Sequence, residues 1–343
     1  MPPTTTTFAV THLDAAAELL AARQRADRLR EPDLPSRYED AAAARAAIEA
    51  VLSQPMTEGM VALDSGRLAG YLIGSIVLPA PTSGQALFVA PRAVQMSEPG
   101  YAAAPGDAIA TYRTLYTALA PRWVAAGCFA HSAIVRRCDE QAMEAWLSLG
   151  FGREMVNGLH DLGPVPGEEE TASVSIAQAG AEDLDVVHGL AIANLRYHAG
   201  SPVFSPYLPE TEPGMRDRLG ELLAEPERAP VWLAERDGRS VGLLNLVTPR
   251  ERLSTPERAI HLMHGYTEPE ARGSGVAGAL LATAFRWARD AGYACCTINW
   301  HTANLLGDRF WQRSGFRPLT YGLTRVIDER IAWAGGEGTP GAW

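Results

Sequence analysis

An internal repeat limits the folds open to this chain more than any other feature of its sequence. The segment DEQAMEAWLSLGFG begins at Asp139, and the similar segment NLLGDRFWQRSGFR begins 165 positions later, at Asn304. Upstream, MVALDSGRLAGYL at 60–72 resembles WLAERDGRSVGLL at 232–244, with a spacing of 172. One small insertion or deletion therefore separates two copies of a single domain.

A polar segment lies between the two copies. Residues 161–173, DLGPVPGEEETAS, contain two prolines, two glycines and three consecutive glutamates. Such a composition is typical of a solvated linker. We therefore predict a first domain at 1–160, a linker at 161–173, a second domain at 174–335 and a short tail at 336–343.

The second copy is predicted to be a mixture of helices and strands in the order ααβββαβαβ. Apolar spacing and turn residues support each element. The helices are expected at 181–198, 212–225, 274–291 and 303–314, and the strands at 231–234, 240–247, 260–267, 294–300 and 318–327. This order predicts the α/β class, more specifically an α+β mixed-sheet layer covered by helices.

The stretch TEPEARGSGVAGALL, residues 267–281, predicts a binding site for an anion. Gly273, Ser274 and Gly275 precede a helix, and no carboxylate occurs between 273 and 289. The first amides of a helix are unpaired and carry partial positive charge, so a strand, a glycine turn and a helix without acids suit a phosphate or pyrophosphate. The turn is neither a P-loop nor a complete G-x-G-x-x-G motif. A turn that packs on a neighbouring strand and binds nothing is the alternative.

At this point the chain resembles the GNAT acyltransferase superfamily. ARGSGVA is similar to its Arg/Gln-x-x-Gly-x-Gly/Ala motif, with Arg272, Gly275 and Ala277 at the defining positions. NLLGDRFWQRSGF resembles its second motif, an Asn-led helix with an aromatic pair and a final Gly-Phe. With the element order, the resemblance covers most of 174–328 and, through the repeat, implies two tandem GNAT-like acyl-CoA N-acyltransferase domains.

The resemblance implies an acyl-CoA co-substrate, either acetyl-CoA or a longer-chain acyl-CoA, and no metal. The pantetheine arm would lie between the strand at Tyr266 and Thr267 and the following strand, with Asn304 facing it. The pyrophosphate would lie beside Arg272, on the main-chain amides of the turn. Those amides belong to Gly273, Ser274, Gly275, Val276 and Ala277.

The first copy departs from the motif at the glycine turn. It reads GYAAAPGDAIATYR there, with Asp107 at the start of the helix. A carboxylate in that position caps its own helix and repels a pyrophosphate. We therefore expect a degenerate, non-catalytic copy that shapes the acceptor cleft or stabilises the second domain.

Transfer of an acyl group from a thioester to an amine requires removal of a proton, and three histidines are candidate bases. His261 in IHLMHGY occupies the strand position at which many GNAT enzymes carry a Glu or His base. His264 is three residues nearer the cofactor and, by strict alternation, on the opposite strand face. His198, in the loop that follows the first helix, is a further candidate base or acceptor contact. Each of the three could instead be a packed imidazole.

The general acid is less well defined by the sequence. Trp311 stands where many GNAT enzymes carry an acidic tyrosine, and its indole cannot supply a proton. Tyr266 and Tyr321 are possible substitutes. A thiolate leaving group, whose thiol pKa is about 8.5, needs no strong acid.

Charge and hydropathy exclude several classes of protein. The net charge is −10 and no basic tract is present, which disfavours nucleic-acid binding. No apolar run reaches the roughly 18 residues of a membrane span. The N-terminus lacks the pattern of a secretory signal, so we expect a cytoplasmic protein. The four cysteines form no CxxC pair and are expected to be buried free thiols rather than a zinc site.

We therefore predict an acyl-CoA-dependent N-acyltransferase in which only the second domain is catalytic. Its acceptor would be an amine of a small molecule or peptide, and the missing glycine motif in the first copy favours natural-product biosynthesis. A mycothiol-synthase-like acetyltransferase is one alternative, and a catalytically inactive acyl-CoA sensor or scaffold is another. Acyl chain length, acceptor identity and oligomeric state stay open at this point.

Overall fold

The computed structural model describes residues 4–164 and 174–332. The first half of the chain, 4–160, forms the following elements: β1 (Thr4–Thr7), α1 (Leu13–Arg28), α2 (Ala41–Leu52), β2 (Thr57–Asp64), β3 (Arg67–Val77), β4 (Ala93–Met96), β5 (Tyr101–Ala103), α3 (Ala108–Ala125), β6 (Ala130–Arg136), α4 (Glu140–Ser148) and β7 (Gly152–His160). The second half, 174–332, repeats this order without a counterpart of β5.

The helices and strands predicted for the second half are confirmed within two or three residues at each end. The elements are β8 (Ser175–Gln178), α5 (Leu184–Ala199), α6 (Glu212–Leu223), β9 (Val231–Arg236), β10 (Arg239–Val247), β11 (Ala259–Thr267), α7 (Val276–Asp290), β12 (Cys295–His301), α8 (Leu305–Arg313) and β13 (Arg317–Val326). The short strand β8 was missed because its four residues are too few to show a period. Residues 165–173 of the predicted linker and the predicted tail lie outside the described residues.

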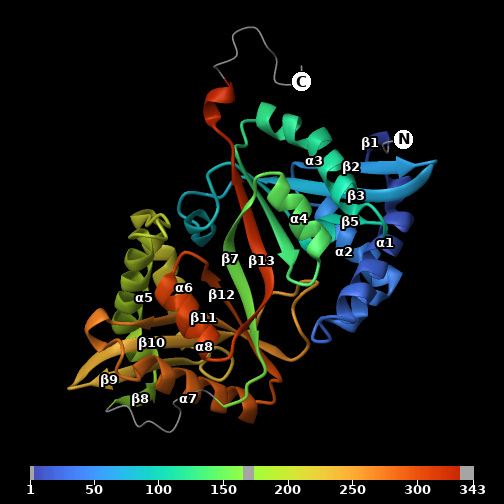
Figure 1. The fold of residues 1–343 in the computed structure, drawn as a ribbon. Helices are drawn as coiled ribbons and strands as arrows, with labels where there is room; N and C mark the ends of the chain where they lie inside the picture. The colour runs from blue at the N-terminus through green and yellow to red at the C-terminus, as the bar shows by residue number, and fades with distance from the viewer. Residues whose placement is uncertain (1–3, 165–173, 333–343) are drawn as a thin grey trace.

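The two halves share one continuous sheet, in which the final strand of each half is exchanged. The described strands follow the order β1-β2-β3-β4-β6-β13-β7-β12-β11-β10-β9-β8, and β5 pairs with β3. Strand β13 lies between β6 and β7, and β7 in turn pairs with β12. In Figure 1 these two long strands run side by side through the centre of the molecule. Each half-sheet is thus completed by a strand from the other half of the sequence.

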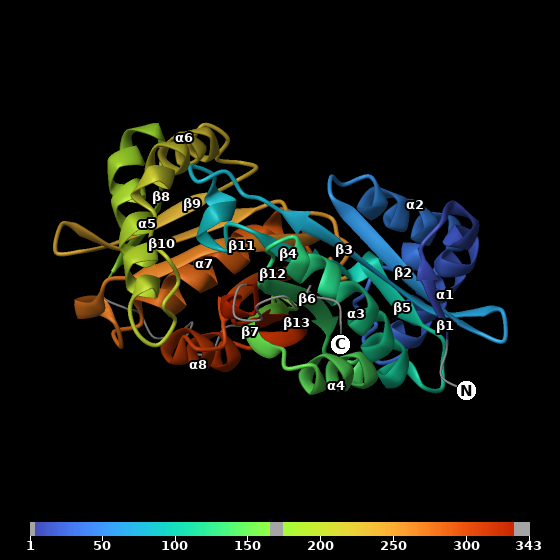
Figure 2. The same ribbon diagram turned by 90° about the horizontal axis from the view of Figure 1, so that it is seen from above.

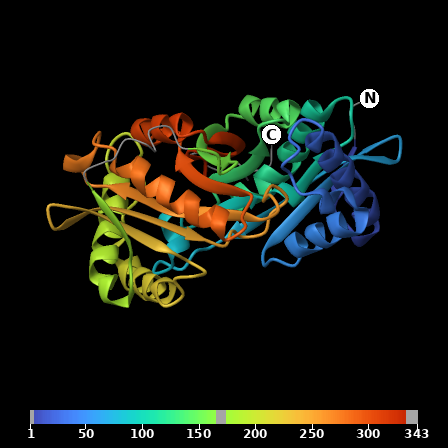
Figure 3. The same cartoon turned by 90° about the horizontal axis from the view of Figure 1, so that it is seen from below.

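Helices cover both faces of each half-sheet. In the second half, alternate residues of β10 separate the two cores: Leu244 and Leu246 pack with α7, whereas Leu243 and Val247 pack with α5 and α6. Strand alternation produces this division, because successive side chains point to opposite faces. The mixed α/β class is therefore confirmed, and Figure 3 shows α7 in orange lying across the strands of its half.

The repeat is also visible in the turns and caps. The β2–β3 turn at Ser65 and Gly66 and the β9–β10 turn at Asp237 and Gly238 all have positive φ, between 51° and 79°. Such pairs of left-handed residues match the twist of a tight hairpin. At the starts of α4 and α8, the predicted equivalents Asp139 and Asn304 both cap their helices by accepting a main-chain N–H bond.

Two loops cross between the halves in a reciprocal way. The β3–β4 loop of the first half approaches the α5–α6 loop, where Ser205 Oγ donates to the Leu87 carbonyl at 3.4 Å. The equivalent β10–β11 loop returns to the first half, where Ser254 Oγ donates to buried Glu98 at 2.7 Å. Figure 2 shows the first of these loops, in cyan, lying beside β9 and α6.

The lengths of the helices and the state of the cysteines bear on two further predictions. Among the described residues, every helix is too short or too polar to cross a bilayer. All four cysteines are free thiols, as predicted; three are buried and Cys138 is partly exposed.

Because β7 and β13 are exchanged between the halves, we expect a packing defect on one of these strands to destabilise both halves. Gly158 on β7 faces Trp300 of β12, and a Cβ atom at Gly158 would lie 2.2 Å from the indole. We expect Gly158→Ala to lower the free energy of unfolding by about 1–3 kcal/mol through overpacking. Urea unfolding followed by fluorescence and by circular dichroism measures this.

Gly152→Ala on the same strand is the matched control, because its Cβ would meet nothing nearer than 3.9 Å. Both probes should show one transition at one midpoint. Two transitions, of which only one moves in Gly158→Ala, would contradict the coupling of the halves.

Candidate functional site

The glycine turn after β11 presents uncapped helix amides to solvent. Gly273 and Gly275 have φ of +75° and +83°, a left-handed conformation that favours glycine. Gly275 is the N-cap of α7, with no side-chain cap and no acid in the first turn. The three residues 273–275 are exposed. The turn thus has the geometry and charge of an anion site.

Two arginines hold this turn in different ways. Arg272 Nε donates to the Thr267 carbonyl at 3.1 Å, and its guanidinium lies 4.4 Å from the centre of the Tyr197 ring. Arg272 therefore links the end of β11 to α5, through one hydrogen bond and one cation–π contact. Arg236, which sequence reasoning missed, donates to Ser274 Oγ at 3.2 Å and to the Glu270 carbonyl at 3.3 Å. Arg236 thus adds a positive charge beside the amides of the turn.

Strands β11 and β12 pair over only part of their length. Their parallel register runs from Ala259 opposite Cys295 to Leu262 opposite Ile298. Beyond that point β11 continues to Thr267 and β12 to His301, without pairing to each other. The main-chain groups along the two parted edges are open to bind an extended amide-containing ligand that leads to the glycine turn.

A β-bulge at Met263 corrects the predicted orientation of His264. Asn245 of β10 opposes His264, whereas the next residue, Leu246, opposes Leu262, so Met263 is an extra residue. The bulge reverses the alternation, since an inserted residue shifts all that follow by one. His261 and His264 therefore lie on the same sheet face, the one covered by α5 and α6, and the prediction of opposite faces was wrong.

Both of these histidines have a partner on a neighbouring strand. His264 Nδ1 lies 2.9 Å from Asn245 Oδ1, and His261 Nδ1 lies 2.9 Å from Thr297 Oγ1. Burial lowers the pKa of each imidazole to about 4, and Arg252 makes a smaller contribution to the shift of His261. Both rings are therefore neutral near pH 7.

His198 belongs to a second group at the open end of the parted strands. Its Nε2 lies 3.2 Å from Asn304 Nδ2, and its ring centre lies 5.7 Å from that of His301. Burial, with a smaller effect of His301, lowers the pKa of His198 to about 4. Asn304 also accepts from the Gly307 amide at 3.1 Å and from the Tyr197 hydroxyl at 3.3 Å.

Trp311 and the candidate acid Tyr266 are packed or bonded elsewhere. Trp311 is buried in the α7 core against Gly265. The Tyr266 hydroxyl donates to Glu268 at 3.2 Å, and burial together with that carboxylate raises the pKa of Tyr266 to about 12. Tyr197, which sequence reasoning missed, places its hydroxyl beside Asn304.

Sequence reasoning also missed Asn245 and His301. Asn245 is the single polar residue in the apolar run VGLLNLV, 241–247, and it is 1% exposed. A lone buried amide in such a run needs a hydrogen-bond partner, and this pattern could have identified it. His301 ends β12, where alternation places it on the same face as Thr297.

The corresponding region of the first half is filled by its own side chains. Asp107 Oδ1 accepts from the Ala110 amide at 3.1 Å and caps α3, as predicted. Strand β4 ends at Met96, opposite Ala133, so the rest of β6 has no partner in β4. Buried Tyr101 crosses that region, and its hydroxyl donates to the Ile134 carbonyl at 2.6 Å.

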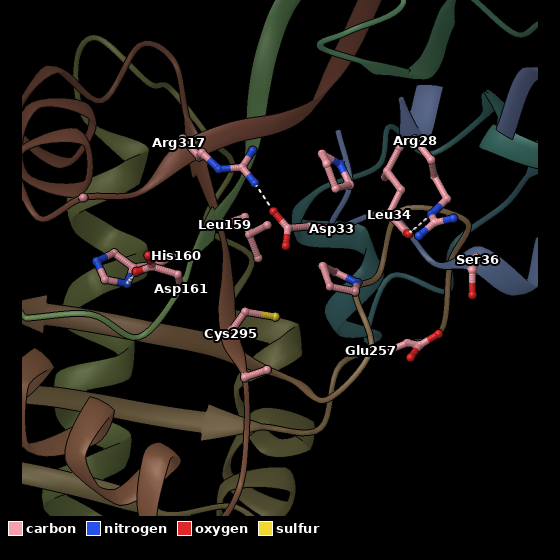
Figure 4. A pocket seen from close by; sticks show the side chains of 14 residues that line it. Arg28, Asp33, Leu34, Ser36, Leu159, His160, Asp161, Glu257, Cys295 and Arg317 are labelled. Carbon is pink, nitrogen blue, oxygen red and sulfur yellow. Dashed lines mark hydrogen bonds and ion pairs between the residues drawn. The ribbon is translucent and has the colours of Figure 1, made fainter. Parts of the chain in front are cut away.

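A pocket between the two halves lies apart from these features. Its volume is about 560 Å³, and Figure 4 shows Asp33, Arg317 and Cys295 among its lining residues. Cys295 begins β12, at the end of the strand opposite to His301. Arg317 forms an ion pair with Asp33 in this pocket. Within the described ranges no three potential metal ligands cluster, here or elsewhere.

Comparisons with known proteins show which proteins the second half is similar to. Residues 195–316 match the model of the acetyltransferase (GNAT) family. Human N-acetyltransferase 8 is 30% identical over 86 residues, which are 25% of this chain and 37% of the relative. The chain thus spans little more than a third of the length of this curated relative.

Two solved structures share the fold of nearly the whole chain at 14% identity. A GCN5-related N-acetyltransferase from Sphaerobacter thermophilus has a TM-score of 0.59, with 94% of this chain and 95% of that chain covered. A tandem GNAT protein from the clavulanic acid biosynthesis pathway has a TM-score of 0.50, with 94% and 98% covered. Residues 195–316 thus match the GNAT family model, and the fold of nearly the whole chain is similar to that of two GNAT proteins.

Proposed function

We propose that the second half binds an acyl-CoA and transfers the acyl group to an amine. The observation that carries the proposal is the uncapped start of α7 at Gly275, at the end of two parted strands, inside the segment that matches the family. The pyrophosphate binds the amides of residues 273–277 with Arg236 nearby. The pantetheine lies along the open edges of β11 and β12, near Asn304.

The reaction is a direct aminolysis. The neutral amine attacks the thioester carbonyl, and a base removes the amine proton. A main-chain N–H on the parted strand stabilises the oxyanion. His261, His264 and His198 are the candidate bases, because each offers a neutral imidazole near the parted strands. The CoA thiolate then leaves.

The acceptor binds on the sheet face that carries His261 and His264. The first half borders this region through its β3–β4 loop, which reaches Ser205, and through the Thr82 carbonyl near Gly214. We propose that the first half shapes the acceptor site and does not bind CoA itself, since Asp107 caps α3 and Tyr101 fills the equivalent gap. A small-molecule or peptide natural product in the cytoplasm is the proposed acceptor.

An inactive acyl-CoA sensor is the second candidate, favoured by Trp311 in place of a proton-donating tyrosine. The two proposals differ in turnover. Release of CoA thiol, followed with a thiol reagent during incubation with amino acids, aminosugars, polyamines and short peptides, supports the enzyme. Tight binding of acyl-CoA with no release in any of these mixtures supports the sensor.

If the pyrophosphate of acyl-CoA binds the glycine turn, a carboxylate introduced at that turn should strongly weaken the binding of acyl-CoA. Ser274 is exposed and has no left-handed backbone, so Ser274→Glu adds charge without strain and also neutralises Arg236. We expect its affinity for acetyl-, octanoyl- and palmitoyl-CoA to fall roughly tenfold or more. Titration calorimetry and thermal shift measure this, since a ligand of the native state raises its stability.

Two variants serve as controls for this experiment. Gly189→Glu adds the same charge to an exposed, open position on α5. Ser274→Ala removes the hydroxyl without adding charge. Both should bind as the wild type does. If no acyl-CoA stabilises the wild type, the turn is structural and the proposal is wrong.

Because three buried histidines are neutral in the folded protein, we expect its stability to fall at mildly acidic pH. His198, His261 and His264 have pKa values of about 4, whereas unfolded histidines titrate near about 6.5. The unfolded chain binds more protons between these values, so the free energy of unfolding falls as the pH drops from about 6.5 to about 4. Urea midpoints over this window measure the slope. His264→Asn lacks one such group and should show a shallower slope; equal slopes would count against the assignment.

A further inference from the structure

The buried amide of Asn245 makes two hydrogen bonds to one residue. Its Oδ1 lies 3.0 Å from the main-chain N of His264 and 2.9 Å from His264 Nδ1. The residues face each other across β10 and β11, next to the bulge at Met263. This pairing fixes the position of the imidazole relative to the sheet.

The first of these bonds identifies the atom types, and the second then fixes the tautomer of His264. A main-chain N–H only donates, so the Asn245 atom that it contacts is the oxygen. An amide oxygen only accepts, so Nδ1 of His264 must carry the hydrogen in the neutral ring. The lone pair is therefore on Nε2, and none of the described residues binds that nitrogen.

The same reasoning separates His264 from the other two histidines. Asn304 Oδ1 accepts from the Gly307 amide, so its Nδ2 is the donor toward His198 Nε2, whose lone pair is already used. His261 contacts the Thr297 hydroxyl, which can donate or accept and leaves its tautomer undefined. Only His264 combines a fixed tautomer with a lone pair that is free of described partners.

We propose that His264 Nε2 is the catalytic base of the second half and that Asn245 is the positioning residue that directs this nitrogen toward the substrate. The inference rests on the proposed function. His264 lies two residues beyond Leu262, the last residue of β11 to pair with β12, so it lies where the strands part.

The step that follows is balanced in atoms and charge. As the amine nitrogen forms its bond to the thioester carbon, His264 Nε2 takes one proton from that nitrogen. The oxyanion collapses, the carbon–sulfur bond breaks, and the sulfur leaves with the electron pair. The imidazolium returns the proton to the thiolate. The products are the amide and CoA thiol, and the enzyme is unchanged.

The second polar atom of Asn245 also points to a ligand here. Its Nδ2 is buried and has no hydrogen-bond partner among the described residues. A buried donor without a partner costs free energy, so its presence beside the base calls for an explanation. An acceptor atom of the bound amine substrate would satisfy it, which would also give Asn245 a role in affinity for that substrate.

Nitrogen NMR of the ¹⁵N-histidine-labelled protein tests the tautomer without any ligand. We expect His264, assigned by its loss in His264→Asn, to show a protonated Nδ1 and an unprotonated Nε2. Asn245→Leu removes the acceptor and should yield a mixture of tautomers. Asn245→Asp keeps an oxygen in place and should preserve Nδ1–H. A predominantly Nε2-protonated His264 in the wild type overturns the proposal.

Steady-state kinetics test the base. His264→Asn keeps a donor for Asn245 but removes Nε2, so we expect kcat to fall by roughly 100-fold or more, with acetyl-CoA affinity by calorimetry unchanged. His261→Asn, on the same strand and face, removes the competing candidate base and should lower kcat far less than His264→Asn does. His12→Asn removes an imidazole of the first half, outside the site, and is the control that should leave kcat unchanged. Asn245→Leu should lower kcat, and Asn245→Asp should restore part of it. The assay uses acetyl-CoA and the amine with the highest turnover.

The outcomes separate the two proposals. If acetyl-CoA binds and the wild type turns over, but His264→Asn retains kcat or His261→Asn loses as much, the inference about His264 is wrong and the proposed function stands. If the wild type binds no acyl-CoA, or shows no turnover with any amine, the enzyme proposal and the base assignment fall together.

Discussion

The antiparallel pairing of β7 with β13 is the interaction on which the rest of the molecule depends. Each strand completes the sheet of the half that it does not belong to in sequence, and together they join two half-sheets into one. The loops that carry Leu87 and Ser254 cross in the same reciprocal way. The shared sheet therefore holds the half with the open glycine turn beside the half without one. The first copy is thus needed to complete the structure, whatever its own chemistry.

The two copies share one fold but differ in charge at the equivalent starts of α3 and α7. Asp107 supplies the negative charge to α3 from within the chain, whereas α7 begins at Gly275 with its amides free. The region beside each helix start differs in the same way, because Tyr101 bonds the Ile134 carbonyl in the first copy, whereas β11 and β12 part in the second. The first copy caps its helix with its own side chain, and the second copy leaves its helix uncapped. A few side chains thus account for the difference between the two helix starts.

Much of the fold and part of the site could be predicted from the sequence. Apolar periodicity located the helices and strands, and the glycine turn located the uncapped start of α7, because both depend on local sequence. The strand exchange could not be predicted, since β7 and β13 have equivalent patterns and either could complete either half. The orientation of His264 depends on the bulge at Met263, which a cross-strand register imposes. The contact between Asn245 and His264 depends in turn on that register, so it became visible only in the structure.

The strand exchange also bears on how the chain is made. On the ribosome the first half emerges complete up to β7, yet the edge of β6 has no partner until residues 317–326 have been synthesised. An open strand edge is a template for unwanted pairing, and contacts so distant in sequence form slowly. The polypeptide must therefore pass through a long interval in which its central edge is unprotected. Chaperone dependence and the yield of soluble protein in a heterologous host would follow from that interval rather than from the stability of the finished molecule.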